Sequence, residues 1–244
     1  MTYCVAINLT EGLVFASDSR TNAGVDHVSV YSKMHNFTWP GDRVFVLLSA
    51  GNLATTQSVV KRLKTDAQHG ETSFLTMSNM TAAADYVGAV SAEVQRQQGN
   101  RDTLNTNFDA TFLLGGQIGN APPELFMIYP QGNYIHESFE HPFLQMGETK
   151  YGKPILDRVI QRSISLELAA RCALVSLNST LRSNLTVGPP LELLIYRRDS
   201  LEEGHHLYLL EDDPYYREMA ERWNEGLLAA LGNLPRFPWE KKLS

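Results

Sequence analysis

Cysteine is scarce in this sequence, and its two cysteines do not form a recognisable framework. Cys4 lies in a predicted strand near the start of the chain, and Cys172 lies in a predicted helix in the last third of the chain. Disulfide scaffolds and zinc modules need several cysteines at short, regular spacings. The adjacent His205 and His206 add no metal site, because neighbours on a strand point to opposite faces. We therefore expect two buried thiols, no metal and no cofactor.

Runs of basic residues and long apolar runs are also missing. The 21 Lys and Arg residues are outnumbered by 27 Asp and Glu residues, so a nucleic acid is not expected as a partner. No apolar run reaches the roughly 18 residues that a membrane span needs, and the first residues lack the pattern of a secretory signal. These absences predict a cytoplasmic protein with no membrane partner.

Linkers, low-complexity tracts and internal repeats are absent as well. The apolar share of 43% and the charged share of 20% are ordinary for a folded globular protein. A chain of 244 residues is long enough for one large domain. We predict a single domain over residues 1–244, with a C-terminal helix and tail extension over about residues 213–244.

Hydrophobic periodicity divides the chain into blocks of strands and pairs of helices. Strands are predicted over residues 2–9, 13–19, 27–37, 43–48, 109–117, 124–129, 133–138, 142–146, 191–197 and 206–210. Helical spacing covers residues 53–63, 83–94, 150–162 and 165–181, and a last helix begins at Pro214 after its N-cap Asp213. Because the order is not a strict βαβ alternation, the strands are expected to be antiparallel. We predict an α+β fold, a four-layer αββα sandwich of two antiparallel sheets covered by helices.

The amino terminus combines a hydroxyl with a carboxylate that the predicted fold brings close. Turn residues 10–12 join the first two strands into a hairpin, which pairs positions whose numbers sum to about 20 or 21. Thr2 is then almost opposite Asp18. A buried, unpartnered carboxylate at the end of an apolar strand would cost several kcal/mol. Lys33, in the next predicted strand, is the cation expected to pair with Asp18.

Removal of Met1 would make Thr2 a complete nucleophilic centre. The freed α-amine has an ordinary pKa of about 7.7 to 8.0 and can accept the proton of the Thr2 hydroxyl, directly or through one water. Lys33, held charged by Asp18, would lower the pKa of that hydroxyl. Taken singly, Thr2 is an ordinary strand residue, and Asp18 with Lys33 is a structural ion pair. It is their combination that favours chemistry.

These segments resemble the proteasome-type peptidases, which are N-terminal-nucleophile hydrolases. The resemblance covers the whole chain and rests on residues 2–6 (Thr-Tyr-Cys-Val-Ala), residues 13–20 (Leu-Val-Phe-Ala-Ser-Asp-Ser-Arg), Lys33 and residues 48–52 (Leu-Ser-Ala-Gly-Asn). It implies that Thr2 is nucleophile and base, with Asp18 and Lys33 as its electrostatic support. It also implies that the backbone N–H of Gly51 binds the oxyanion, where glycine allows close approach, and that a substrate pocket lies near Leu53.

The second half of the chain departs from the usual pattern of that family. Gly147-Glu148-Thr149 replaces a Gly-Ser-Gly turn, and residues 182–188 (Arg-Ser-Asn-Leu-Thr-Val-Gly) replace an Arg-Asp-x-x-Ser-Gly segment. The remaining candidates for polar support around the site are Ser19, Arg20, Glu148, Ser183 and Thr186. An extra carboxylate at position 148 would alter the pKa of the amine. These departures, with the extended C-terminus, resemble the bacterial Anbu (ancestral β-subunit) branch.

The resemblance implies a threonine-type endopeptidase that forms an acyl-enzyme on Thr2. Its expected partners are a peptide or protein substrate and further copies of itself, in a ring or in a helical or lock-washer array. Several relatives use an ATP-dependent unfoldase, but nothing in this sequence names one. Two alternatives stay open. One is an amidase or isopeptidase that uses the same centre on a restricted substrate, and the other is a catalytically weak, self-assembling binding protein.

Overall fold

The computed structural model describes residues 1–22, 28–100 and 106–240, and the chain divides into two compact units. The first unit is Met1–Leu210. The second unit, Glu211–Ser244, contains helix α5 (Pro214–Gly232), which begins where the sequence predicts. The side chain of Asp213 accepts a hydrogen bond of 3.0 Å from the Tyr216 N–H and caps the helix. The single domain over residues 1–244 stays a prediction.

The strands of the first unit come in three blocks that pairs of helices separate, as predicted. The first block contains β1 (Tyr3–Leu9), β2 (Gly12–Asp18), β3 (Arg20–Asn22), β4 (Val28–Val30), β5 (Met34–Trp39) and β6 (Arg43–Gly51). Then follow α1 (Leu53–His69), a short 3₁₀ helix η1 (Phe74–Thr76), α2 (Met80–Gly99), β7 (Ala110–Ile118), β8 (Glu124–Ile128), β9 (Tyr134–His136) and β10 (Phe143–Gly147). The unit continues with α3 (Lys153–Val159), α4 (Leu166–Ser183), β11 (Leu191–Arg197) and β12 (His205–Leu209).

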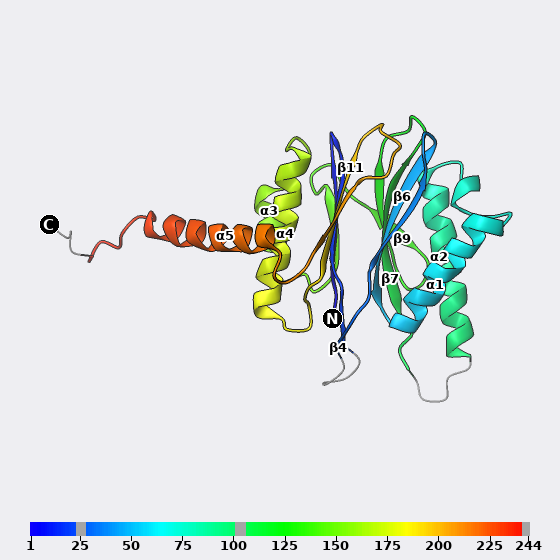
Figure 1. The fold of residues 1–244 in the computed structure, drawn as a ribbon, viewed down its shortest axis with the longest axis horizontal. Coiled ribbons are helices and arrows are strands. Elements are labelled where there is room, and N and C mark those ends of the chain that lie inside the picture. Colours follow the sequence, from blue (N-terminus) through cyan, green and yellow to red (C-terminus); the bar gives the residue numbers. More distant parts are fainter. Residues whose placement is uncertain (23–27, 101–105, 241–244) are drawn as a thin grey trace. The chain divides into compact units, whose positions relative to one another are not determined.

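Two five-stranded antiparallel sheets face each other in this unit. One sheet has the strand order β10-β1-β2-β11-β12 and the other the order β5-β6-β7-β8-β9, while β3 and β4 form a separate small hairpin. Figure 1 shows α1 and α2 outside the β5–β9 sheet, and α3 and α4 outside the sheet that contains β1. The predicted α+β fold, a four-layer αββα sandwich, is therefore confirmed.

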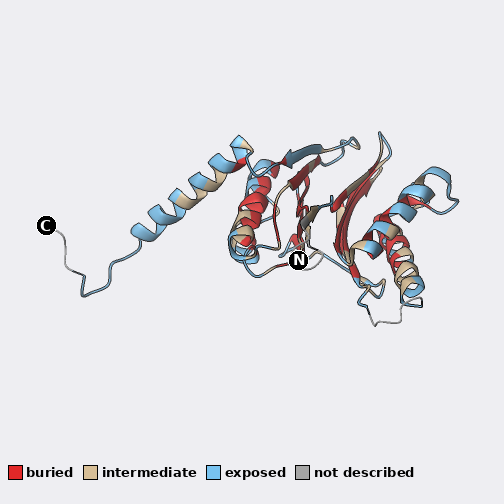
Figure 2. Ribbon diagram, turned by 60° about the horizontal axis from the view of Figure 1, so that its bottom comes forward, coloured by how far each residue is buried: buried red, intermediate tan, exposed pale blue. Residues whose placement is uncertain are grey.

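Alternate side chains along a strand fill different apolar layers. In β1, Cys4 belongs to the layer between the sheets, whereas the Tyr3 hydroxyl lies 2.5 Å from the Ser176 hydroxyl of α4. In β6, Val46 joins the same inner layer, whereas Phe45 packs in the layer beneath α1 and α2. Buried residues accordingly line both sheets and the inward sides of the helices (Figure 2). Because both faces of these strands are covered, their sequences are nearly continuous apolar runs.

The single strand predicted over residues 27–37 is wrong in its middle. β4 ends at Val30 and β5 begins at Met34, while residue 27 lies outside the described residues. β4 pairs with β3, whereas β5 pairs with β6 in the second sheet. The chain must therefore leave one sheet and enter the other, and Lys33 lies in this crossing. The short strand β3 was not predicted.

Candidate active site

Thr2 is half-buried at the start of β1, where the end of β10 fixes its backbone. The Thr2 carbonyl accepts a hydrogen bond of 2.7 Å from the Glu148 N–H. Gly147 has a φ of +87°, and a Cβ at this position would collide with the Thr2 carbonyl. Glycine is thus required at position 147 for both its backbone angle and this close approach. The backbone of Thr2 is consequently fixed by the neighbouring strand.

Asp18 is fully buried at the end of β2, and its carboxylate accepts three hydrogen bonds. Oδ1 accepts from the Tyr3 N–H at 2.9 Å and from Lys33 Nζ at 2.6 Å, and Oδ2 accepts from the Gly188 N–H at 3.2 Å. The hairpin pairs Cys4 with Ser17, so its paired positions sum to 21, within the predicted range. Asp18 therefore lies opposite Tyr3, which is the residue that follows Thr2.

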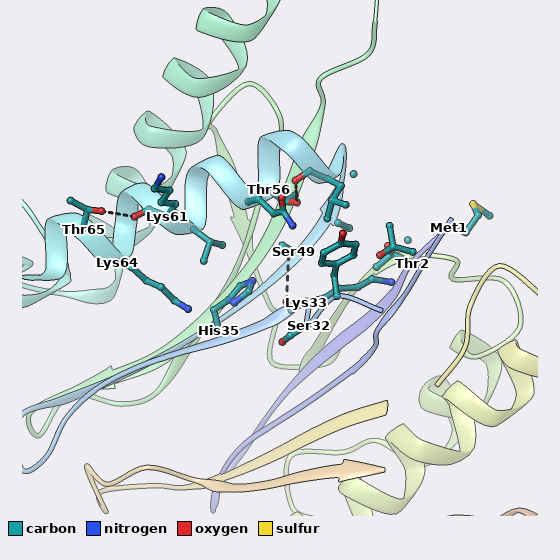
Figure 3. A pocket seen from close by; sticks show the side chains of 18 of the residues that line it. Met1, Thr2, Ser32, Lys33, His35, Ser49, Thr56, Lys61, Lys64 and Thr65 are labelled. Carbon is teal, nitrogen blue, oxygen red and sulfur yellow. Dashed lines mark hydrogen bonds between the residues drawn. The ribbon is translucent and has the colours of Figure 1, made fainter. Parts of the chain in front are cut away.

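Lys33 joins the two sheets at the site. Only 6% of Lys33 is exposed, and its Nζ donates to the Arg20 carbonyl at 2.8 Å as well as to Asp18. Its own carbonyl accepts a hydrogen bond of 2.9 Å from the Ser49 N–H of β6. The backbone of Lys33 is thus held by one sheet and its ammonium by the end of the other. Figure 3 shows this side chain extending toward Thr2.

Burial and charge act in opposite directions on the groups of the site. Burial is the larger effect on Asp18 and raises its pKa, while the Lys33 ammonium and the two N–H donors oppose that rise. Burial and the Lys33 charge lower the pKa of the α-amine of Met1, and Asp18 opposes this effect. A lower pKa leaves more of an amine free to accept a proton at neutral pH. The chain terminus therefore lies within the field of the Asp18–Lys33 pair.

Gly51 and Leu53 lie where β6 passes into α1. Gly51 has a φ of +114°, and a Cβ there would collide with the Asp109 carbonyl, so this position also requires glycine. Asn52 caps α1, since its side chain accepts a hydrogen bond of 3.2 Å from the Thr55 N–H. The cap sets the direction in which α1 leaves the sheet. Leu53 is the first residue of the helix and is half-buried.

Ser19 and Arg20 follow Asp18 and support the segments around it. The Ser19 hydroxyl donates to Oε1 of the buried Glu192 at 3.2 Å, and Glu192 Oε2 lies 3.2 Å from Nε2 of His206. The guanidinium of Arg20 donates to the Leu185 carbonyl at 2.8 Å. These two side chains therefore hold β11 and the segment after α4 against the end of β2.

Glu148 and Thr186 belong to one hydrogen-bonded network. The buried Glu148 accepts from the Asn184 side-chain amide at 3.0 Å and from the Lys150 N–H at 3.2 Å. Oδ1 of Asn184 in turn accepts from the Thr186 hydroxyl at 2.6 Å. Ser183 is exposed at the end of α4. The network therefore runs through Asn184, a residue that the sequence did not single out.

A pocket of about 630 Å³ lies beside Thr2 and holds several of the predicted site residues in its wall. Thr2, Lys33, Gly51 and Leu53 all line it. Figure 3 shows Thr2 and Met1 at one end and residues of α1 at the other. Thr2 thus faces a space large enough to receive part of a substrate.

The backbone donors to Asp18 are a part of the site that the sequence did not reveal. The N–H groups of Tyr3 and Gly188 hold Asp18, but every residue except proline carries an N–H, so no residue type marks such a donor. Gly188 offers one signal, because a Cβ there would collide with the Arg20 side chain. Sequence alone does not identify such a contact between segments so far apart.

Among residues 1–22, 28–100 and 106–240, no three or more His, Cys, Asp and Glu side chains are grouped so that they could hold a metal ion. None of the helices in these residues is long and apolar enough to cross a membrane.

The chain is similar to a known protein family and to solved structures. Residues 2–195 match the proteasome subunit family. The chain is 46% identical to the structure of Anbu (ancestral beta-subunit) from Yersinia bercovieri, with a TM-score of 0.91 over 96% of this chain and 99% of that chain. It is 47% identical to a chain of the helical assembly of the Anbu complex from Pseudomonas aeruginosa, with a TM-score of 0.93 over 97% and 98% of the two chains. A search of curated proteins found no significant match.

Proposed function

Because this chain belongs to the proteasome subunit family, and within it to the Anbu branch, we propose that it is a threonine-type endopeptidase. The family and branch predicted from the sequence are confirmed, and the activity is our proposal. The observation that carries it is the 2.6 Å ion pair of Asp18 and Lys33, buried at the pocket that Thr2 lines. Removal of Met1 would free the α-amine of Thr2 beside this pair.

In the first half of the reaction, Thr2 becomes acylated. The α-amine of Thr2 takes the proton of the Thr2 hydroxyl as Oγ attacks the peptide carbonyl, and the Lys33 ammonium stabilises the developing alkoxide. The Gly51 N–H is the proposed donor to the tetrahedral oxyanion. When the C–N bond breaks, the ammonium of Thr2 returns the proton to the leaving amine. The acyl group is then held as an ester on Oγ.

In the second half, water releases the acyl group. The α-amine accepts a proton from the water molecule while the water oxygen attacks the ester carbonyl. The bond between the carbonyl carbon and Oγ breaks, Oγ regains the proton, and a carboxylic acid leaves. The same amine therefore serves as base and then as acid in both halves.

Two measurements on the purified full chain test the proposal. Intact-mass spectrometry should show that Met1 has been removed. A peptide epoxyketone should then increase the mass of the wild type by the mass of one inhibitor molecule, and should leave the mass of a Thr2→Ala variant unchanged. Thr81→Ala is the matched control, because Thr81 is exposed on α2, outside the pocket. It should be labelled like the wild type.

Other outcomes would favour the alternatives. A retained Met1 would leave no free amine on Thr2 and would favour a self-assembling binding protein without this chemistry. Labelling that survives Thr2→Ala would reject Thr2 as the nucleophile. Turnover of small amides or isopeptides, but not of peptides, would indicate the restricted amidase or isopeptidase that uses the same centre.

We also propose that the chain forms a homo-oligomer. The similar protein from Pseudomonas aeruginosa forms a helical assembly. In the second unit of this chain, Leu228 and Leu231 of α5 are each 64% exposed. Large exposed apolar side chains close together on one helix are typical of a contact surface.

A further inference from the structure

The pocket beside Thr2 continues along helix α1, and two lysines line its far part. Its α1 wall consists of Leu53, Thr56, Gln57, Val60, Lys61, Lys64, Thr65 and Gln68. These positions recur three or four residues apart, as residues on one helix face do. The wall is apolar at Leu53 and becomes cationic from Lys61 onward. Figure 3 shows Lys61 and Lys64 away from the end that holds Thr2.

Among the residues that the structure describes, the two positive charges have no acidic counterpart in the pocket. None of the described residues that line it is Asp or Glu, and no ion pair in the described part of the chain involves Lys61 or Lys64. Asp66, the acidic residue of α1, accepts hydrogen bonds from Arg62 and from the Tyr86 hydroxyl. Its carboxylate is therefore already bonded to groups outside the pocket.

The charge of Lys64 acts inside the pocket. His35 of β5 also lines it, and the Lys64 charge adds to burial in lowering the pKa of His35. A charge that disfavours a second cation at His35 favours an anion in the same space. The described lining contains no anionic side chain. An anionic ligand is therefore the group that this part of the pocket would favour.

The distances along α1 suit a short stretch of peptide. At about 1.5 Å of rise per residue, Lys61 and Lys64 lie about 12 and 16 Å along the helix from Leu53. An extended peptide advances about 3.3 Å per residue. Four extended residues therefore span about 13 Å, to which the length of an acidic side chain adds. A carboxylate within about four positions of a peptide carbonyl that lies beside Leu53 could thus reach the lysines.

We propose that Lys61 and Lys64 bind the carboxylate of an acidic residue within four positions of the scissile bond, and so select acidic peptide substrates. This inference rests on the proposed function of Thr2. Neither lysine touches the reacting atoms. Their role is to fix the register of the peptide, so they determine specificity rather than chemistry.

Paired peptides test the selection. Internally quenched eight-residue peptides carry either Glu or Gln at one position at a time, and kcat/KM is measured at low and at high salt. In at least one position the Glu peptide should be cleaved about 5- to 30-fold faster at low salt, and the ratio should fall as salt screens the charges. Equal rates at every position would overturn the inference.

Charge variants identify the lysines as the cause. The double variant Lys61→Gln/Lys64→Gln should bring the Glu-to-Gln ratio close to one, and Lys61→Glu/Lys64→Glu should favour a Lys peptide over the Glu peptide. Arg171→Gln is the control, since it removes one positive charge at an exposed residue of α4 outside the pocket. A loss of the ratio in Arg171→Gln as large as in the double variant would reject the assignment.

A binding measurement separates this inference from the proposed chemistry. The Thr2→Ala variant, which cannot form the ester, is mixed with the acetylated amide peptides Ala-Ala-Glu-Ala or Ala-Ala-Gln-Ala, and saturation-transfer NMR gives their affinities. Binding of the Glu peptide about 5-fold tighter, lost when both lysines are changed to Gln, would support the inference even if the wild type cleaves nothing. Cleavage without any charge preference would support the proposed function and overturn the inference.

Discussion

The carboxylate of Asp18 joins three segments that are distant in the sequence. It accepts hydrogen bonds from Tyr3 of β1, from Lys33 in the crossing between the sheets and from Gly188 before β11. Its charge is balanced by Lys33, and both side chains are almost completely buried. Removing one charge would leave the other unpaired in an apolar setting, which costs more than removing both.

We therefore predict a non-additive effect on stability. Lys33→Met and Asp18→Asn should each lower the free energy of unfolding by about 3–5 kcal/mol, whereas the double variant should recover to within about 2 kcal/mol of the wild type. All three variants should lose epoxyketone labelling, because the field around Thr2 is gone. Urea denaturation of the processed protein measures the stabilities.

The exposed pair of Lys153 and Asp157 is the control for this cycle, with side chains 49% and 41% exposed. Lys153→Met should cost less than about 1 kcal/mol, because solvent screens such a pair. A double variant of the buried pair as unstable as the sum of its single variants would show that the two charges do not depend on each other.

His35 gives a prediction about pH. Burial and Lys64 lower its pKa to about 4, below the ordinary value near 6.5. Between these two values the unfolded chain binds a proton on His35 and the folded chain does not, so acidification through this window favours unfolding. Allowing for partial exposure to solvent, we expect a loss of about 1–2 kcal/mol between pH 6.5 and 4.

The measurement compares urea unfolding of the wild type and of His35→Asn at several pH values. Carboxylates titrate near pH 4 in both proteins, so their effect cancels in the difference. The wild type should lose more stability than the variant as pH falls through this window. Parallel curves would show that His35 titrates normally in the folded state.

Residue-level prediction was successful where local geometry carried the information. The short turn at residues 10–12 fixes the hairpin register, and so places Asp18 next to Thr2. The Glu148–Asn184–Thr186 network depends on how the end of α4 meets the end of β10. That contact has no period or spacing from which the sequence could reveal it.

At the scale of elements, α1 connects the site with the pocket. Its first residue, Leu53, lies close to Gly51 in the sequence, and its later turns form the wall that contains the two lysines. Asn52 holds the first turn of the helix, through its acceptor to Thr55 and a donor to the Asn107 carbonyl at 3.0 Å. Fraying of this turn would displace the pocket wall nearest to Thr2.

Asn52→Ala should consequently lower stability by about 1 kcal/mol and raise KM more than it lowers kcat. Asn79 caps α2 in the same way, accepting from the Ala82 N–H at 2.8 Å, but no residue of α2 lines the pocket, whereas α1 forms one of its walls. Asn79→Ala should therefore show a similar loss of stability with little change in KM. Equal changes of KM in the two variants would show that helix capping affects activity only through general stability.

Most helices and strands were predicted well because their apolar residues recur with a clear helical or strand period. The prediction was wrong where packing between distant segments interrupts a strand. Residues 31–33 lie inside the predicted strand, yet they leave the small hairpin so that β5 can join the second sheet. That change of sheet brings Lys33 to Asp18. The interruption is thus the place where long-range packing overrides local preference.

At the scale of the whole molecule, self-assembly gives the main prediction. Light scattering should give a particle mass well above the 27.3 kDa of one chain. Leu228→Glu/Leu231→Glu would place charges among the exposed apolar side chains of α5, and should shift the mass toward that of one chain. Arg217→Glu, also exposed on α5, is the control and should leave the assembly intact. An unchanged mass in the double leucine variant would exclude this surface as a contact.

The first residue of the chain has a consequence for how activity would arise. Met1 lines the same pocket as Thr2 and is 59% exposed. While Met1 is attached, the nitrogen of Thr2 is part of a peptide bond and cannot act as a base, and the exposed Met1 can be reached without unfolding. Under the proposed function each copy is latent until one cut at its first peptide bond, and the specific activity of a preparation should rise in proportion to the share of trimmed chains.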